Sequence, residues 1–211
     1  MLSDSDSVAS STPAPAEAAN DARADAVVIG ASAGAVESLS ELLPPLSEGL
    51  RVPLIVVVHL PPRRSSLMPE LFRPLCRAPV CEPVDKQPVA AGTIWFAPAD
   101  YHLLVEHNRT FALSVDPPVR FSRPSLDVLF ESAADTYGAR LAAVVLTGAN
   151  DDGARGAKAV RAAGGYVLVQ APAEALARTM PEAAIHLAAP QFVGGLAQIG
   201  SKLRVLTGAS P

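Results

Sequence analysis

Short hydrophobic runs alternate with longer amphipathic segments from Asp25 onward. In residues 35–43, for example, Val36, Leu39, Leu42 and Leu43 recur at the three-to-four-residue spacing of a helix. Continuous apolar strands that alternate with helices are typical of a parallel sheet covered on both faces. The pattern therefore predicts an α/β fold: a three-layer sandwich around a doubly wound, mostly parallel sheet. The predicted strands are 26–30, 52–59, 141–148 and 166–170, and the predicted helices are 35–43, 65–75, 151–165 and 172–187.

The middle of the chain departs from this alternation. Residues 93–115 read as two or three short strands joined by turns, which predicts an antiparallel excursion from the main sheet. Residues 123–138 then return to a helical pattern. The side chains expected on the buried face of that helix are Leu126, Leu129, Phe130 and Ala133.

Residues 1–24 are rich in Ser, Ala, Pro and Asp and carry few large apolar side chains. Such a segment buries too little surface to offset its loss of conformational entropy, so we expect a disordered leader before one domain at 25–207. Its acidic residues do not fit a secretory signal, and no run reaches the roughly 18 apolar residues of a membrane-spanning helix. We therefore expect a cytoplasmic protein that is not embedded in a membrane.

Composition narrows the classes of partner. The 211 residues are 49% hydrophobic, 18% charged and 5% aromatic, enough for one domain with a large aliphatic core. A formal net charge of -4 gives no broad basic surface, so we do not expect nucleic-acid binding. Cys76 and Cys81 are five residues apart, which fits neither a redox pair nor a usual zinc site. We expect two reduced thiols, no metal and no cofactor.

The loops after the predicted strands are the candidate sites, because ligands of open α/β sheets bind at the carboxyl ends of the strands. The loop 30–34, "GASAG", lacks the second glycine of a dinucleotide fingerprint, and the next strand does not end in an acidic residue. It does match GxSxG, which would expose Ser32 as a nucleophile at a helix N-terminus. The loop therefore gives little support to a nucleotide-binding regulator, which is the weakest alternative to the functions described below.

Two further strands end in residues that could assist Ser32. His59 follows the second strand, and Asp151 and Asp152 follow a later one. A lone histidine there is often just a polar strand end, and either aspartate could simply cap the next helix. Together, however, Ser, His and Asp supply a nucleophile, a base and a group that orients the base. Their order along the chain differs from that of the α/β-hydrolases, which disfavours that fold.

Six blocks in order and spacing resemble the catalytic domain of the chemotaxis protein-glutamate methylesterase family, CheB. They are "VVIGASAGAVESL", "VVVHLPP", "FAPADYHLLV", "SRPSLDVLFESAA", "VVLTGANDDGARGAKAVRAAGG" and "TMPEAAI". The resemblance implies hydrolysis of glutamate γ-methyl esters on the cytoplasmic helices of chemoreceptors, with release of methanol. Related enzymes also deamidate receptor glutamines.

The resemblance implies a role for each matching residue. Ser32 is expected to be the nucleophile, His59 the general base and Asp152 its partner. The site is further expected to include the backbone N–H groups of Ala33 and Ala149, which would stabilise an oxyanion. Met180, in "TMP", is expected to line the site.

The chain departs from the family pattern beside these residues. GASTGG is GASAGA here, HRPS is SRPS with Ser122 in place of an imidazole, and TGMGNDG is TGANDDG. These changes motivate an alternative function, a catalytically silent module that docks on receptor or signalling proteins. Family members commonly carry a receiver domain that gates the site. Because the leader is too short for one, we expect an ungated enzyme or one regulated by a separate receiver protein.

Overall fold

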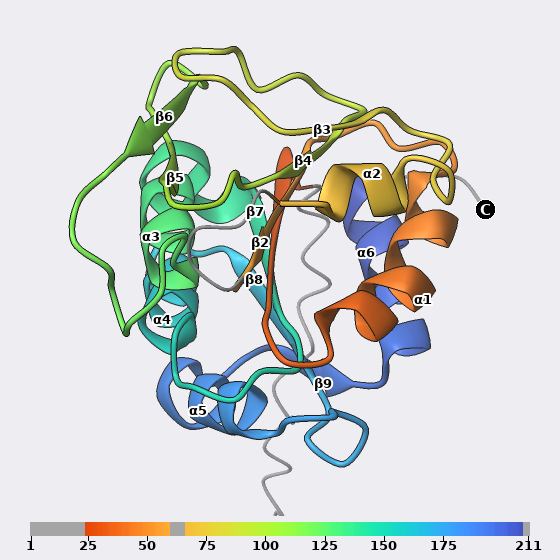
Figure 1. Cartoon of the computed structure of the whole chain (residues 1–211). Helices are drawn as coiled ribbons and strands as arrows, with labels where there is room; N and C mark the ends of the chain where they lie inside the picture. The colour runs from red at the N-terminus through yellow and green to blue at the C-terminus, as the bar shows by residue number, and fades with distance from the viewer. Residues whose placement is uncertain (1–23, 60–65, 209–211) are drawn as a thin grey trace, which may run out of the picture.

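The computed structural model describes residues 24–59 and 66–208 (Figure 1). The predicted leader therefore lies outside the described residues, with the exception of Ala24. That residue is buried, and its backbone N–H donates a hydrogen bond to the carbonyl oxygen of Leu206. Ala24 thus packs with the domain, and the predicted boundary itself stays a prediction.

A seven-stranded sheet forms the centre of the molecule, and every neighbouring pair of its strands is parallel. The strand order reverses beside β1, so the chain winds outward in both directions from the middle of the sheet. This confirms the predicted doubly wound sheet. In spatial order the strands are β3 (Val80–Cys81), β4 (Ile94–Phe96), β2 (Leu54–Val58), β1 (Ala26–Ala31), β7 (Leu141–Val145), β8 (Tyr166–Gln170) and β9 (Phe192–Gly194).

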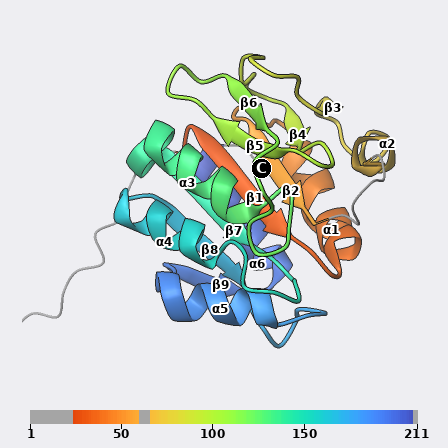
Figure 2. The same cartoon turned by 60° about the vertical axis from the view of Figure 1, so that its left-hand side comes forward.

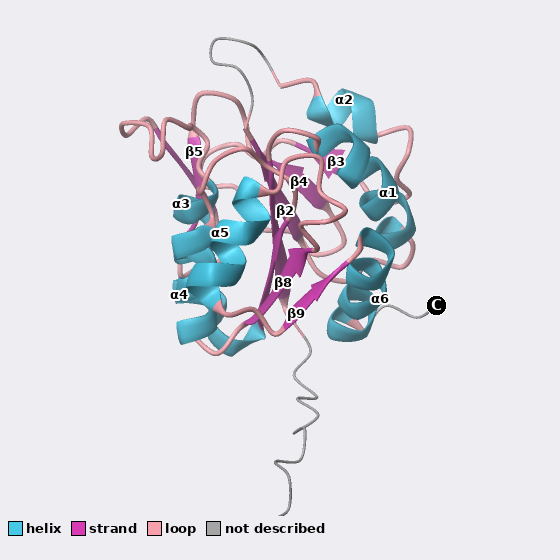
Figure 3. Cartoon of the chain, turned by 90° about the horizontal axis from the view of Figure 1, so that it is seen from below, coloured by secondary structure: helices cyan, strands magenta, loops and turns pink. Residues whose placement is uncertain are grey.

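Helices cover both faces of this sheet and complete the three predicted layers (Figures 1 and 3). Alternate residues of β1 enter opposite cores: Val27 and Ile29 join one, Ala26 and Val28 the other. Each core is closed by its own helices. The first layer holds α1 (Ala35–Ser47), α2 (Met68–Phe72) and α6 (Leu196–Thr207); the second holds α3 (Leu126–Tyr137), α4 (Ala154–Ala162) and α5 (Thr179–Ala188), with the 3₁₀ turn Gly138–Arg140 after α3.

The middle segment is divided between two sheets. Strand β4 joins the parallel sheet beside β2, and its three residues are buried. The antiparallel excursion is the separate pair β5 (His102–Val105) and β6 (Phe111–Ser114), which lies against α3 (Figure 2). The prediction of an antiparallel excursion is thus confirmed for β5 and β6 but not for β4.

Other predicted details differ in extent. The buried face of α3 is as predicted, whereas Val36 of α1 is 41% exposed. The predicted helix at 65–75 is the five-residue α2, and the helix expected from residue 172 begins at Thr179. Within the described residues, no helix has both the length and the apolar character needed to cross a bilayer.

Candidate active site

Ser32 and His59 follow neighbouring strands at the same edge of the sheet. Ala31 of β1 lies opposite Val58 of β2, so the next residue of each strand is one of this pair. The His59 backbone N–H donates to the Ala31 carbonyl at 3.2 Å, and the Ser32 N–H donates to the Thr147 carbonyl at 2.9 Å. Ser32, His59 and Thr147, which follow β1, β2 and β7, therefore lie together where the strand order reverses.

Two glycines explain the turn that carries Ser32. Gly30 lies so close to Leu126 of α3 that an added Cβ would be 2.0 Å from the leucine Cδ2. Gly34 has a φ of 83°, a left-handed conformation that favours glycine. Ala35 then begins α1, and its N–H donates to the Ser32 carbonyl at 2.9 Å. Ser32 thus lies, half-buried, at the positive end of a 13-residue helix.

His59 and Asp152 form a direct side-chain contact. The Nε2 of His59 is 2.7 Å from Oδ2 of Asp152, and the carboxylate is completely buried. Three further donors from the start of α3 point at the same carboxylate. They are the Ser125 hydroxyl at 2.8 Å, the Leu126 N–H at 2.7 Å and the Asp127 N–H at 3.1 Å. Each carboxylate oxygen therefore accepts two hydrogen bonds.

These donors decide the charge of Asp152. Burial raises its pKa, but the hydrogen bonds from His59, the Leu126 N–H, Ser125 and the Asp127 N–H outweigh burial, and the pKa lies below its usual value. Asp152 is therefore ionised and accepts at both oxygens. It follows that Nε2 of His59 carries a proton, which leaves Nδ1 of a neutral ring as the acceptor.

Asp152 caps the N-terminus of α3, although the helix that follows it in the sequence is α4. Asp127 of α3 in turn accepts from the N–H groups of Gly153 and Gly156 at the start of α4. Burial raises the pKa of Asp127, and the charge of Asp152 raises it further. Asp151 instead lies at the surface, 2.8 Å from Arg120.

The three predicted accessory residues lie at different depths. Ala33 and Ala149 are exposed, and within the described part of the chain neither backbone N–H donates a hydrogen bond. Met180 is fully buried, and its side chain packs against Gly148. Its N–H donates to the Gly148 carbonyl at 2.9 Å, so Met180 supports the loop of Ala149 from the core side.

Thr147, which we did not single out from the sequence, joins three loops. Its hydroxyl donates to the Ala33 carbonyl at 2.7 Å and accepts from the Ala177 N–H at 2.9 Å. Its backbone carbonyl also accepts the Ser32 N–H. A threonine after a buried strand has no distinctive sequence signal, because its partners are 30 and 114 residues away.

We expect Thr147→Val to loosen this junction. The methyl group that replaces the hydroxyl leaves the Ala33 carbonyl and the Ala177 N–H without a partner, which costs about 1–3 kcal/mol. The free energy of unfolding, measured by urea denaturation, should fall by that amount. Thr179→Val, at an exposed threonine, should change it by less than about 0.5 kcal/mol. Equal values for the two variants would contradict the role of Thr147.

His102 and Ser125 are two further residues that we did not predict. His102 is buried, its Nδ1 accepts from the Ser125 N–H at 3.2 Å, and its Nε2 lies 3.1 Å from the Pro117 carbonyl. Because Nδ1 accepts, the ring is neutral and Nε2 donates. His102 thus fixes Ser125, which in turn donates to Asp152. The sequence signal is weak, because a histidine beside a strand is often no more than a polar residue at the strand end.

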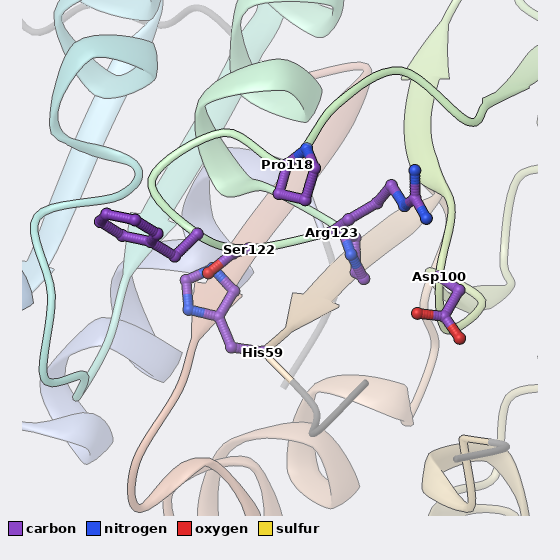
Figure 4. Close-up of a pocket in the computed structure, with 7 residues that line it drawn as sticks. His59, Asp100, Pro118, Ser122 and Arg123 are labelled. Atoms are coloured by element: carbon purple, nitrogen blue, oxygen red, sulfur yellow. The ribbon is translucent and has the colours of Figure 1, made fainter. Parts of the chain in front are cut away.

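A small pocket of about 150 Å³ opens beside His59. In Figure 4, His59 projects from the end of β2 toward the loop that carries Pro118, Ser122 and Arg123, while Asp100 comes from a different loop. Within residues 24–59 and 66–208, no cluster of His, Cys, Asp or Glu side chains could hold a metal ion. The imidazole of His59 thus borders the pocket, whereas Ser32 is not among the residues that line it.

Comparison with known proteins identifies the family of this chain. Residues 27–203 match the family model described as CheB methylesterase. A Leptospira interrogans protein named putative protein-glutamate methylesterase/protein-glutamine glutaminase is 38% identical over 175 residues, which are 83% of this chain and 91% of that protein. A Trichodesmium erythraeum protein of the same name, without "putative", is 37% identical over 74% of this chain and 45% of its own length.

The fold comparison points the same way. The crystal structure of the Thermotoga maritima CheB methylesterase catalytic domain superposes with a TM-score of 0.79 at 30% identity, over 85% of this chain and 97% of that domain. The residues matched by the family model include Ser32, His59 and Asp152. This chain belongs to the CheB methylesterase family of hydrolases.

Proposed function

We propose that the protein is a protein-glutamate methylesterase that hydrolyses glutamate γ-methyl esters on the cytoplasmic helices of chemoreceptors and releases methanol. The observation that carries this proposal is the contact between the buried, ionised Asp152 and His59. His59 follows β2, the strand that pairs with β1, and Ser32 follows β1. The names of the relatives support the substrate class. A substrate on the cytoplasmic side of a receptor also favours a cytoplasmic enzyme.

The first half of the reaction forms an acyl-enzyme. Nδ1 of His59 accepts the hydroxyl proton of Ser32 as Oγ attacks the ester carbonyl carbon. Asp152 stabilises the imidazolium through Nε2. As the tetrahedral intermediate collapses, His59 gives the proton to the departing methoxy oxygen and methanol leaves.

Water completes the cycle. His59 accepts a proton from water while the oxygen attacks the acyl carbon, and it then returns that proton to Oγ of Ser32. The products are a glutamate carboxyl group and the original enzyme. Throughout, the negative carbonyl oxygen requires donors, and we assign this role to the N–H groups of Ala33 and Ala149, which have no partner among the described residues.

The same steps would release ammonia from a glutamine side chain, since the acyl-enzyme is identical. The relatives are named for both activities. The hydrogen-bonded Thr147 and the buried Met180 support the two loops that hold the proposed oxyanion donors. We further propose that a separate receiver protein, where one is present, regulates this site.

Release of labelled methanol tests the proposal. Membranes that contain receptors methylated with a labelled methyl group should release volatile label when the protein is added, and a small ester such as p-nitrophenyl acetate should also be hydrolysed. A catalytically silent docking module would bind the membranes but release no label and hydrolyse no small ester. That result would contradict the proposed esterase activity and favour the docking module as the function of the protein.

A further inference from the structure

A loop of residues 115–124 borders the pocket beside His59 and presents a phenylalanine to solvent. The side chain of Phe121 is fully exposed, yet it lines the same pocket as His59. A fully exposed aromatic ring leaves much apolar surface in water. A protein segment that enters the pocket beside His59 therefore approaches this ring.

The backbone of the loop is held in an unfavourable conformation. Arg120 and Phe121 have φ values of 50° and 63°, and both lie in the left-handed region although neither is glycine. Residues with this strain cluster at binding and catalytic sites, where surrounding contacts maintain it. A glycine would remove this strain, so Arg120 and Phe121 each carry a conformational cost at the tip of the loop.

Hydrogen bonds at the base of the loop maintain this conformation. Val119 and Ser122 exchange two backbone hydrogen bonds, of 3.1 and 2.8 Å. Arg120 pairs at 2.8 Å with Asp151, the residue before Asp152. Nη1 of Arg123 donates to the carbonyls of residues 115 and 116 at 2.7 and 3.0 Å. The exposed ring is therefore presented by a fixed turn.

We propose that Phe121 is a substrate-docking residue that determines the preference of the enzyme for protein esters. Its ring packs against an apolar side chain of the receptor helix that carries the esterified glutamate. On an amphipathic helix, residues three or four positions from a glutamate lie beside it, so an apolar neighbour reaches Phe121 while the ester reaches Ser32. This inference rests on the proposed function, since it assigns a substrate contact to the same site.

Phe121→Gly is the decisive variant. It removes the ring and suits the left-handed backbone, so we expect the protein to remain folded. With methylated receptor membranes, KM should rise about tenfold or more, which is the effect of losing one large apolar contact. Methyl acetate carries only a methyl group on each side of the ester, so it has nothing to pack against the ring, and kcat/KM for this ester should change less than about twofold. Phe121→Leu should restore most of the receptor activity.

Val205→Ala provides the matched control. Val205 is an exposed apolar residue of α6, on the opposite face of the sheet, and its substitution should affect neither ester. An unchanged KM of Phe121→Gly for receptor membranes would overturn the docking role. Equal losses on both esters would also overturn it, because the ring would then act through the geometry of the site.

A binding assay separates this inference from the proposed function. Ser32→Ala should sediment with methylated receptor membranes, and addition of Phe121→Gly should weaken that binding about tenfold. If wild-type protein hydrolyses neither ester, the proposed function fails, and the sedimentation result still decides the docking role. Equal sedimentation of the single and double variants would rule out a contact through Phe121.

Discussion

Ser32→Ala is expected to lower the release of methanol from methylated receptors by at least about 10³-fold, with no loss of folding. Without Oγ no acyl-enzyme forms, and the oxyanion donors and substrate binding leave a residual enhancement of about 10³–10⁴-fold over the uncatalysed reaction. The backbone contacts of Ser32, which tie its loop to Thr147 and Ala35, do not involve the side chain. The free energy of unfolding should therefore change by less than about 0.5 kcal/mol. Labelled methanol release and urea denaturation measure the two quantities.

Ser40→Ala is the matched control for this variant. Ser40 is an exposed serine of α1, the helix that follows Ser32, so the same hydroxyl is removed away from the site. Its activity and stability should equal those of the wild type. Full methanol release by Ser32→Ala would show that another group is the nucleophile. A serine-reactive fluorophosphonate should likewise label the wild type and Ser40→Ala but not Ser32→Ala.

Asp152→Asn is expected to impair both catalysis and stability. The amide group would place an N–H₂ where two donors now point, so His59 loses the partner that fixes its tautomer. A fall of about 10⁴-fold in kcat follows from such a loss. The buried N–H of Leu126 at the start of α3 would also lose its acceptor, which costs about 3 kcal/mol of unfolding free energy.

The pH dependence of that stability difference has a defined sign. The pKa of Asp152 in the folded state lies below the ordinary value of 3.8, so the folded protein holds the proton less tightly than the unfolded chain does. Its stabilising contribution is fully present above about pH 3.8 and is lost as the pH falls through the folded pKa. The wild type should therefore exceed Asp152→Asn in stability at neutral pH, and the gap should close in acid.

Asp151→Asn separates this effect from a general loss of charge. Asp151 is the adjacent residue, but its side chain is 48% exposed and pairs at the surface with Arg120. Surface pairs contribute about 0–1 kcal/mol, so the stability of Asp151→Asn should remain close to that of the wild type. A stability gap for Asp152→Asn that widened as the pH fell would contradict a depressed pKa, and equal losses in the two variants would contradict the specific role of Asp152.

Much of the fold follows from local pattern. The buried strands read as continuous apolar runs, and the face of α3 that holds Leu126, Leu129 and Phe130 was predictable from its spacing. Strand β4 was not, because three buried residues pair equally well in either direction until β2 is placed beside them. Val36 fits the helical spacing but reaches solvent, since no other described element covers it.

The site divides in the same way. That Ser32, His59 and Asp152 follow strands of one parallel sheet could be predicted from the sequence, and their catalytic roles stay a prediction. The identity of the capped helix could not be predicted, because Asp152 meets Ser125 across 27 residues and His59 across 93. The sequence by itself determined which residue types stand at the strand ends. Tertiary structure alone decided which donors meet the buried carboxylate, and therefore its charge and the protonated nitrogen of His59, because contacts between distant segments leave no local periodicity.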